Sequence, residues 1–160
     1  MQSKAYLYLI KLLSSRDYSE FKLREKLREK QYPANEIDEA ITEIKAKNYL
    51  REENYAEARV KAFMHKGYSP DYIKQKLAQE HVYVEAEFIE SIYCENRNDS
   101  DDQIRTLVEK KLRGKKLANY EEEVKLIRFV LSKGHQIGAI KKILKEYKTS
   151  YSKEYYNDLE

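Results

Sequence analysis

The chain has 160 residues, of which 31 are Lys or Arg and 28 are Asp or Glu, so its formal net charge is +3. This balance is too even to indicate a nucleic-acid partner by itself, and no stretch reaches the ~18 apolar residues that a membrane-spanning helix needs. The single cysteine, Cys94, excludes an internal disulfide and is typical of a cytoplasmic protein. Only 2 Pro and 4 Gly interrupt the chain, which favours an all-α fold.

Three stretches repeat one helical pattern without gaps. They are RDYSEFKLREKL at 16–27, KGYSPDYIKQKL at 66–77 and KGHQIGAIKKIL at 133–144. Ser19, Ser69 and Gln136 occupy the position where each helix should begin. The apolar pairs that follow are four residues apart and so share one helix face: Leu23 and Leu27, Ile73 and Leu77, Ile140 and Leu144. A pattern that returns in this way predicts an array of helical units.

Another predicted helix precedes each of these stretches. Its matched apolar pairs are Ile10 and Leu13, Val60 and Phe63, and Ile127 and Val130. Gly67 and Gly134 follow two of these helices at the C-terminal cap, where a left-handed backbone costs glycine little. Each copy is therefore predicted to be a helix, a tight turn and a second helix, which Ser69 and Pro70 would begin in the second copy.

Further helices are predicted between the copies. Their apolar stripes are Ile37, Ile41 and Ile44 after the first copy, and Val84, Phe88 and Ile92 after the second. A separate helix begins with acidic residues at Asp99 and ends with basic residues before Gly114, as the helix dipole favours. After Leu144 the sequence KEYKTSYSKEYYNDLE shows only a weak helical pattern.

These elements predict about nine helices in three units, at 1–50, 51–98 and 99–160. Each unit alone is too small to be stable, so neighbouring units are expected to stack. The predicted fold is an all-α, elongated and curved tandem array of three-helix units. A single globular helical bundle is the alternative architecture.

The sequence shows no pattern of a catalytic or metal site. It contains no Gly-rich phosphate-binding loop, and His65, His81 and His135 lie far apart, without partners at zinc-binding spacing. His135 stands where the other copies have tyrosine, which predicts a packing role. Acidic pairs such as Glu52 and Glu53 begin helices, where the dipole explains them. We therefore expect no enzyme, no cofactor and no metal.

Basic residues recur on the second helices and gather densely in the third unit. The recurring residues are Arg24, Lys26, Arg28, Lys74, Lys76, Lys141 and Lys142, and the dense cluster is Arg105, Lys110, Lys111, Arg113, Lys115 and Lys116. If the units stack in register, these cations form a broken track that would bind phosphates in a salt-dependent way. Solvation of exposed helix faces is the alternative explanation. Acidic residues concentrate on the first and third helices, which favours a protein–nucleic acid assembly over bare DNA as the partner.

Several stretches together form a pattern that covers nearly the whole chain. They are YSEFKLREKL, QYPANEIDEAITEIKAKNYLREENYAEARV, KGYSPDYIKQKL, IRTLVEKKL and LIRFVLSKGHQIGAIKKIL. This pattern resembles the RecX family of recombinase regulators. The residues that fill the family's positions are Ser19, Leu23, Leu27, Tyr32, Pro33, Leu50, Glu52, Glu53, Tyr55, Ala56, Gly67, Tyr68, Ser69, Pro70, Ile73 and Leu77. Arg51, Asn54 and the pair His135–Gln136 depart from the family's usual residues.

The resemblance implies a regulator of homologous recombination, DNA repair and the SOS response. Such a protein binds the RecA–DNA filament along its groove and inhibits ATP hydrolysis and strand exchange, with single- or double-stranded DNA as a further partner. We expect it to act as a monomer. An independent DNA-binding helical protein and a helical protein-interaction scaffold are the alternatives. Against the former, no predicted helix is rich in base-reading Asn, Gln and Arg.

Overall fold

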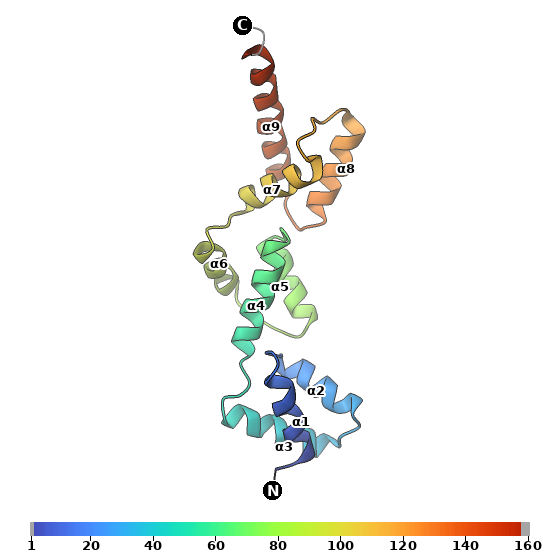
Figure 1. Ribbon diagram of the computed structural model, residues 1–160, viewed down its shortest axis with the longest axis vertical. Coiled ribbons are helices and arrows are strands. Elements are labelled where there is room, and N and C mark those ends of the chain that lie inside the picture. Colours follow the sequence, from blue (N-terminus) through green and yellow to red (C-terminus); the bar gives the residue numbers. More distant parts are fainter. Residues whose placement is uncertain (1, 158–160) are drawn as a thin grey trace.

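The computed structural model describes residues 2–157, and within them the side chains of residues 2–149. The described residues form nine α-helices and no strand: α1 (Lys4–Leu13), α2 (Glu20–Glu29), α3 (Ala34–Ala46), α4 (Glu52–His65), α5 (Pro70–Gln79), α6 (Ala86–Glu95), α7 (Ser100–Leu112), α8 (Tyr120–Leu131) and α9 (Ile137–Asn157). They follow one another along an elongated body, with α1–α3 at one end and α7–α9 at the other (Figure 1). The predicted all-α tandem array is confirmed, and the alternative of one globular bundle is wrong.

Capping side chains fix where several of these helices begin. The Ser69 hydroxyl accepts a hydrogen bond from the Tyr72 N–H at 3.3 Å, and Pro70 is the first residue of α5, as predicted. Ser19 caps α2 in the same way, and Asp99 accepts from the Asp102 N–H at 2.8 Å to cap α7. Losing such a cap costs about 1 kcal/mol. These residues therefore favour one starting position for the helix that follows each of them.

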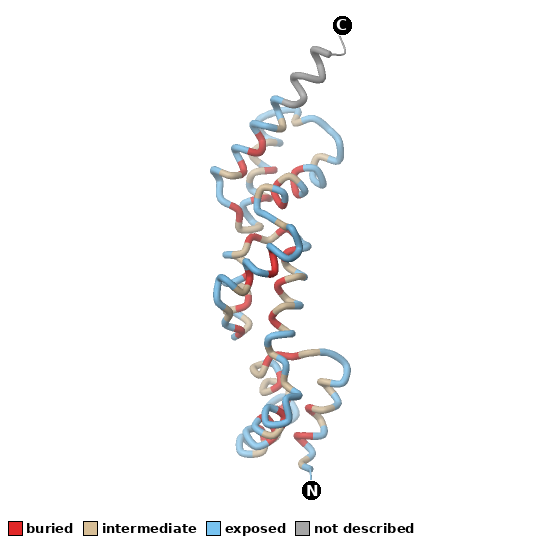
Figure 2. Tube along the Cα trace, turned by 90° about the vertical axis from the view of Figure 1, so that its left-hand side faces the viewer, coloured by how far each residue is buried: buried red, intermediate tan, exposed pale blue. Residues whose placement is uncertain are grey.

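The buried residues are distributed along the whole body (Figure 2), and they form three separate hydrophobic clusters. Helices α1–α3 enclose the first, α4–α6 the second and α7–α9 the third; we call these trios unit 1, unit 2 and unit 3. Each has fully buried residues at its centre, such as Leu9 in unit 1, Val60 in unit 2 and Ile104 in unit 3. Each trio thus has a core of its own. The boundaries 1–50, 51–98 and 99–160 remain a prediction.

The apolar positions that match between the second helices of the three copies, α2, α5 and α9, are all buried, as predicted. Leu23, Ile73 and Ile140 are each 0% exposed, and their partners four residues on are at most 1% exposed. The match between the first helices is only partly right, because Val60 is buried whereas Ile10 and Ile127 are half-buried. The stripe predicted for α6 is also shifted: Val84 and Phe88 are half-buried, and the buried residues are Ile89, Ile92 and Tyr93.

Unit 3 differs from the other units in the order of its helices. Its additional helix, α7, precedes the pair α8–α9 and packs against both, whereas α3 and α6 follow their pairs. Despite the weak helical pattern after Leu144, the chain stays helical there, and α9 continues to Asn157. No Gly or Pro follows Gly138, and Lys and Glu sustain a helix well. Residues 158–160 of that stretch lie outside the described residues.

Units 2 and 3 are joined by buried hydrogen bonds at the turns that precede α5 and α9. The Ser69 N–H donates to the Lys133 carbonyl at 2.9 Å, and His135 Nε2 lies 2.8 Å from the Gly67 carbonyl oxygen. The Gln103 amide donates to two carbonyl oxygens of unit 2, those of Met64 and Tyr68, each at 3.2 Å. Ser69, Gln103 and His135 are all buried. This contact, which we call the 2–3 junction, therefore pairs buried donors of one unit with carbonyl oxygens of the other.

Units 1 and 2 meet in a less buried contact. The Glu20 N–H donates to a carboxylate oxygen of Glu52 at 3.2 Å, and the rings of Phe21 and His81 stack with centroids 3.9 Å apart. Phe21 is half-buried and His81 is exposed. Water therefore reaches part of the contact between these two units.

Acidification is expected to destabilise the protein through His135. Burial lowers the pKa of His135 below its ordinary value of 6.5, and the hydrogen bond with Gly67 acts in the opposite direction. The unfolded histidine then binds a proton more readily than the folded one. The free energy of unfolding should therefore fall as the pH decreases below about 6.5.

Chemical denaturation at about pH 7.5 and about pH 5.5 measures this effect, in an interval above the ordinary range of carboxylates. His135→Gln retains a donor for the Gly67 oxygen but does not titrate, so its stability should depend less on pH. Equal pH dependence in the variant and the wild type would show that His135 is not the source.

Candidate functional site

Arg24, Arg105 and Lys142, which are predicted contact residues, form ion pairs with other described residues. The pairs are Arg24 with Glu20 (2.9 Å) and Asp38 (2.6 Å), Arg105 with Asp102 (3.0 Å) and Glu146 (3.3 Å), and Lys142 with Asp101 (3.0 Å). The hydrogen bond to Asp38, followed by that to Glu20, raises the pKa of Arg24. Because a neighbouring carboxylate cancels much of each charge, these cations are poorly placed to attract an external anion.

Another group of lysines rests on aromatic rings. The ammonium of Lys26 lies 5.8 Å from the ring centre of Tyr18, that of Lys76 lies 5.4 Å from Tyr72, and that of Lys111 lies 4.8 Å from Phe129. An aromatic face attracts a cation but carries no net charge. These lysines are therefore positioned while their full positive charge remains available to a partner.

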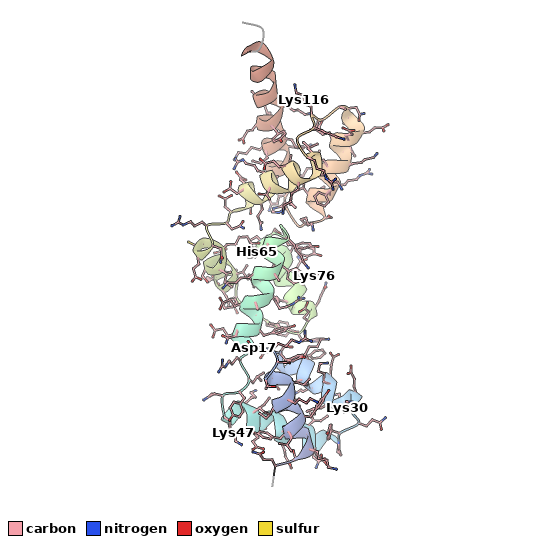
Figure 3. The ribbon with its side chains drawn as sticks, in the orientation of Figure 1. Asp17, Lys30, Lys47, His65, Lys76 and Lys116 are labelled. Carbon is pink, nitrogen blue, oxygen red and sulfur yellow. The ribbon has the colours of Figure 1, made fainter. Side chains whose placement is uncertain are left out.

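Lys76 and Lys111 are the two ends of a strip that crosses from unit 2 to unit 3. The rings of Tyr72 and Tyr68 stack with centroids 4.6 Å apart. Lys133 lies 4.1 Å from the ring centre of Tyr68 and 5.7 Å from that of Phe129, and so connects the two units. We call Lys76, Tyr72, Tyr68, Lys133, Phe129 and Lys111 the cation–aromatic strip. Figure 3 shows Lys76 on the flank of α5.

Sequence reasoning missed Lys133 as a candidate contact residue. It stands directly before Gly134, in the turn that joins α8 to α9. The signal that could have identified it is the corresponding position in unit 2, Lys66, which also precedes the repeated glycine. Its nearer aromatic partner, Tyr68, belongs to unit 2, so no local sequence pattern predicts that contact.

A hollow of about 310 Å³ in unit 3 shares Lys111 with the strip. Its lining residues are Lys111, Leu112, Lys115, Lys116, Ala118, Glu122, Lys125 and Leu126. Four of these described residues are lysines and only Glu122 is acidic, so the hollow attracts anions. We call it the lysine hollow. Lys125 was not among the predicted contact residues, because it lies on α8, outside the dense cluster.

The dense basic cluster of the sequence does not form one patch. Arg105 pairs with Glu146 of α9, whereas Lys110 lines a different hollow, of about 220 Å³, together with Met64 of α4. Lys111, Lys115 and Lys116 line the lysine hollow. Successive helix residues point about 100° apart, which separates neighbours in sequence. The other predicted contact residues, Arg28, Lys74, Arg113 and Lys141, are exposed.

The described residues contain no candidate metal centre. No three His, Cys, Asp or Glu side chains among them lie close enough together to hold an ion. His135 is 5% exposed and bonded to Gly67, which confirms the packing role predicted for it. Within the same residues, no helix has the length and apolarity needed to cross a membrane.

Known proteins with similar sequences and structures agree on one family. The family model of the first three-helix domain of RecX matches residues 5–43, and that of the third three-helix domain of RecX matches residues 99–144. Regulatory protein RecX of Haemophilus influenzae (strain PittEE) is 35% identical over 123 residues, which are 77% of this chain and 77% of that protein. Regulatory protein RecX of Legionella pneumophila (strain Corby) is 28% identical over 93% of this chain and 98% of its own length.

The crystal structure of RecX from Lactobacillus salivarius superposes with a TM-score of 0.70. The superposition covers 91% of this chain and 96% of that chain, at 23% sequence identity. It shows that both proteins share one fold.

Proposed function

Because this chain belongs to the RecX family of regulatory proteins, we propose that it binds the RecA filament on DNA and inhibits ATP hydrolysis and strand exchange. In this proposal the protein catalyses nothing itself and works in the cytoplasm, in recombination and DNA repair. Its partner is the assembled nucleoprotein filament.

The observation that supports this proposal most is the cation–aromatic strip together with the lysine hollow. Lys76, Lys133 and Lys111 are held by rings and keep their charge, and Lys115 and Lys125 extend the positive surface in unit 3. The surface crosses two units of an elongated body, so it can follow a run of successive phosphates. Such binding releases counterions and weakens as salt concentration rises.

The inhibition follows from the shape of the protein. Three units in line reach farther than one compact domain of the same length, so a bound molecule can touch more than one RecA subunit (Figure 1). In this mechanism the strip faces the DNA, and acidic surfaces of unit 2 face cations of RecA. Bridging the subunits obstructs the movements that ATP turnover requires.

Adding the protein to RecA on single-stranded DNA and following ATP turnover tests the proposal. Turnover should fall as the protein saturates the filament, and higher salt should relieve the inhibition. Unchanged turnover at saturation would reject the proposed function. Tight, sequence-selective binding to duplex DNA without RecA would instead favour an independent DNA-binding protein.

A further inference from the structure

A hollow of about 420 Å³ in unit 2 combines acidic and apolar side chains. Its lining residues are Glu52, Glu53, Ala56, His81, Val82, Tyr83, Val84, Glu85 and Phe88. They come from the start of α4, from the segment between α5 and α6, and from α6 itself. We call this feature the acidic hollow. His81 also stacks on Phe21 of α2, so the acidic hollow lies where unit 2 meets unit 1.

The apolar part of the acidic hollow is open to solvent. Tyr83 is 77% exposed, and Val84 and Phe88 are half-buried. An aromatic ring so exposed contributes little to the stability of its own fold, since most of its surface remains in water. Exposed aromatic residues beside apolar neighbours are typical of binding surfaces, where they serve as anchors.

The carboxylates at the rim remain available to a partner. Glu53 and Glu85 form no ion pair within the described part of the chain, and Glu52 accepts a hydrogen bond from the Glu20 N–H. Residues 51–98 as a whole carry 9 acidic and 7 basic side chains. The starts of α4 and α6 explain why acidic residues stand here. The helix starts do not explain why the apolar side chains of Tyr83, Val84 and Phe88, which solvent reaches, lie beside these carboxylates.

We infer that the acidic hollow docks a cationic amphipathic segment of a protein partner. An apolar side chain of that segment lies against Tyr83, Val84 and Phe88, and flanking Lys or Arg residues pair with Glu53 and Glu85. A nucleic acid does not fit this surface, because the carboxylates repel phosphates. The inference rests on the proposed function in one respect: the filament's protein component is the partner that supplies the segment.

The docking test uses a fluorescent lysine–leucine amphipathic helical peptide as its probe, and a glutamate–leucine peptide as the opposite-charge control. Binding is measured with the full chain, with Glu53→Gln/Glu85→Gln, and with Tyr83→Ser. The matched control is Glu39→Gln/Glu90→Gln, which removes two exposed carboxylates from other surfaces of α3 and α6. Each test variant should bind the lysine–leucine peptide at least about tenfold more weakly, and the control should bind it as the wild type does.

Equal affinities of the wild type and both test variants for this peptide would overturn the inference, as would preference for the glutamate–leucine peptide. Binding of the same variants to the RecA filament on DNA should weaken in parallel. Wild-type protein that inhibits ATP turnover, with test variants that bind RecA undiminished, would reject docking at this hollow but keep the proposed function. Hollow-dependent peptide binding by a protein that leaves turnover unchanged would support docking and reject the proposed function.

Discussion

Gly134→Ala is expected to destabilise the protein by about 2–4 kcal/mol, because it disrupts the 2–3 junction. Gly134 has a φ of +87°, a backbone conformation that L side chains rarely adopt. A Cβ atom there would lie 2.6 Å from the Ser69 hydroxyl oxygen and 2.6 Å from the Tyr72 Cβ. Both atoms belong to unit 2 and are held by the start of α5. Either the two units separate or the buried hydrogen bonds of the junction are distorted.

Substitutions at two other glycines distinguish the stability cost of backbone strain from the cost of close packing. Gly114 has a φ of +76° but no atom within 4 Å of a built Cβ, so Gly114→Ala should cost only about 1 kcal/mol. Gly138 lies in α9 with nothing within 4 Å, and Gly138→Ala should be neutral or stabilising by up to about 1 kcal/mol. Guanidinium unfolding followed by circular dichroism measures all three variants. If Gly134→Ala costs no more than Gly114→Ala, the two units are not closely packed.

The second helices could be predicted from the sequence because their starts are marked locally. In α2 and α5 a serine cap fixes the first turn, and the apolar residues four and eight positions later then point inward. The inward direction of these apolar residues follows from the serine cap and the helix period alone, and it needs no residue of another unit. The gap-free match of Leu23, Ile73 and Ile140 therefore describes equivalent positions in space, all fully buried.

The first helices do not share such a marker, and the match between them failed in part. Helix α4 begins after Arg51 without a capping side chain, whereas Ser3 caps α1 and Asn119 caps α8. The buried face of α4 includes Val60 and Met64, while Leu9 and Leu126 are buried in the other two helices. Packing against neighbouring helices determines which face of each first helix is buried. Residue spacing along the chain does not show which face that is.

The candidate site could be predicted only as a set of basic residues. Their environments depend on long-range partners: Arg105 meets Glu146, which lies 41 residues away, and Lys133 meets Tyr68 of another unit. These partners decide whether a cation is neutralised or kept charged. Sequence spacing therefore could not separate Arg105, which is paired with Glu146, from Lys111, which lies on Phe129.

The difference between cations paired with carboxylates and cations held on aromatic rings predicts which cations bind DNA. Lys76→Gln/Lys111→Gln/Lys133→Gln should weaken binding to the RecA–DNA filament by about 100-fold at about 0.1 M salt. Each lost phosphate contact on single-stranded DNA removes about 0.7 from the slope of log affinity against log salt. Three lost contacts reduce the magnitude of this negative slope by about 2, which corresponds to about two decades of affinity at that salt concentration. Fluorescence anisotropy of labelled DNA in the filament, measured over a salt series, gives both quantities.

Lys4→Gln/Lys11→Gln/Lys30→Gln is the matched control, because it removes the same charge from exposed positions of unit 1. The control should leave the salt slope within about 0.5 of the wild-type value, since these lysines are not phosphate contacts in the proposed mode. Lys142→Gln should likewise have little effect, because its charge is already compensated by Asp101. If the two triple variants lose affinity equally, the filament responds to the net charge of the protein, and the cation–aromatic strip is not its contact surface. A loss confined to the strip variant would instead mean that aromatic rings, by holding ammonium groups without neutralising them, select which lysines reach the phosphates.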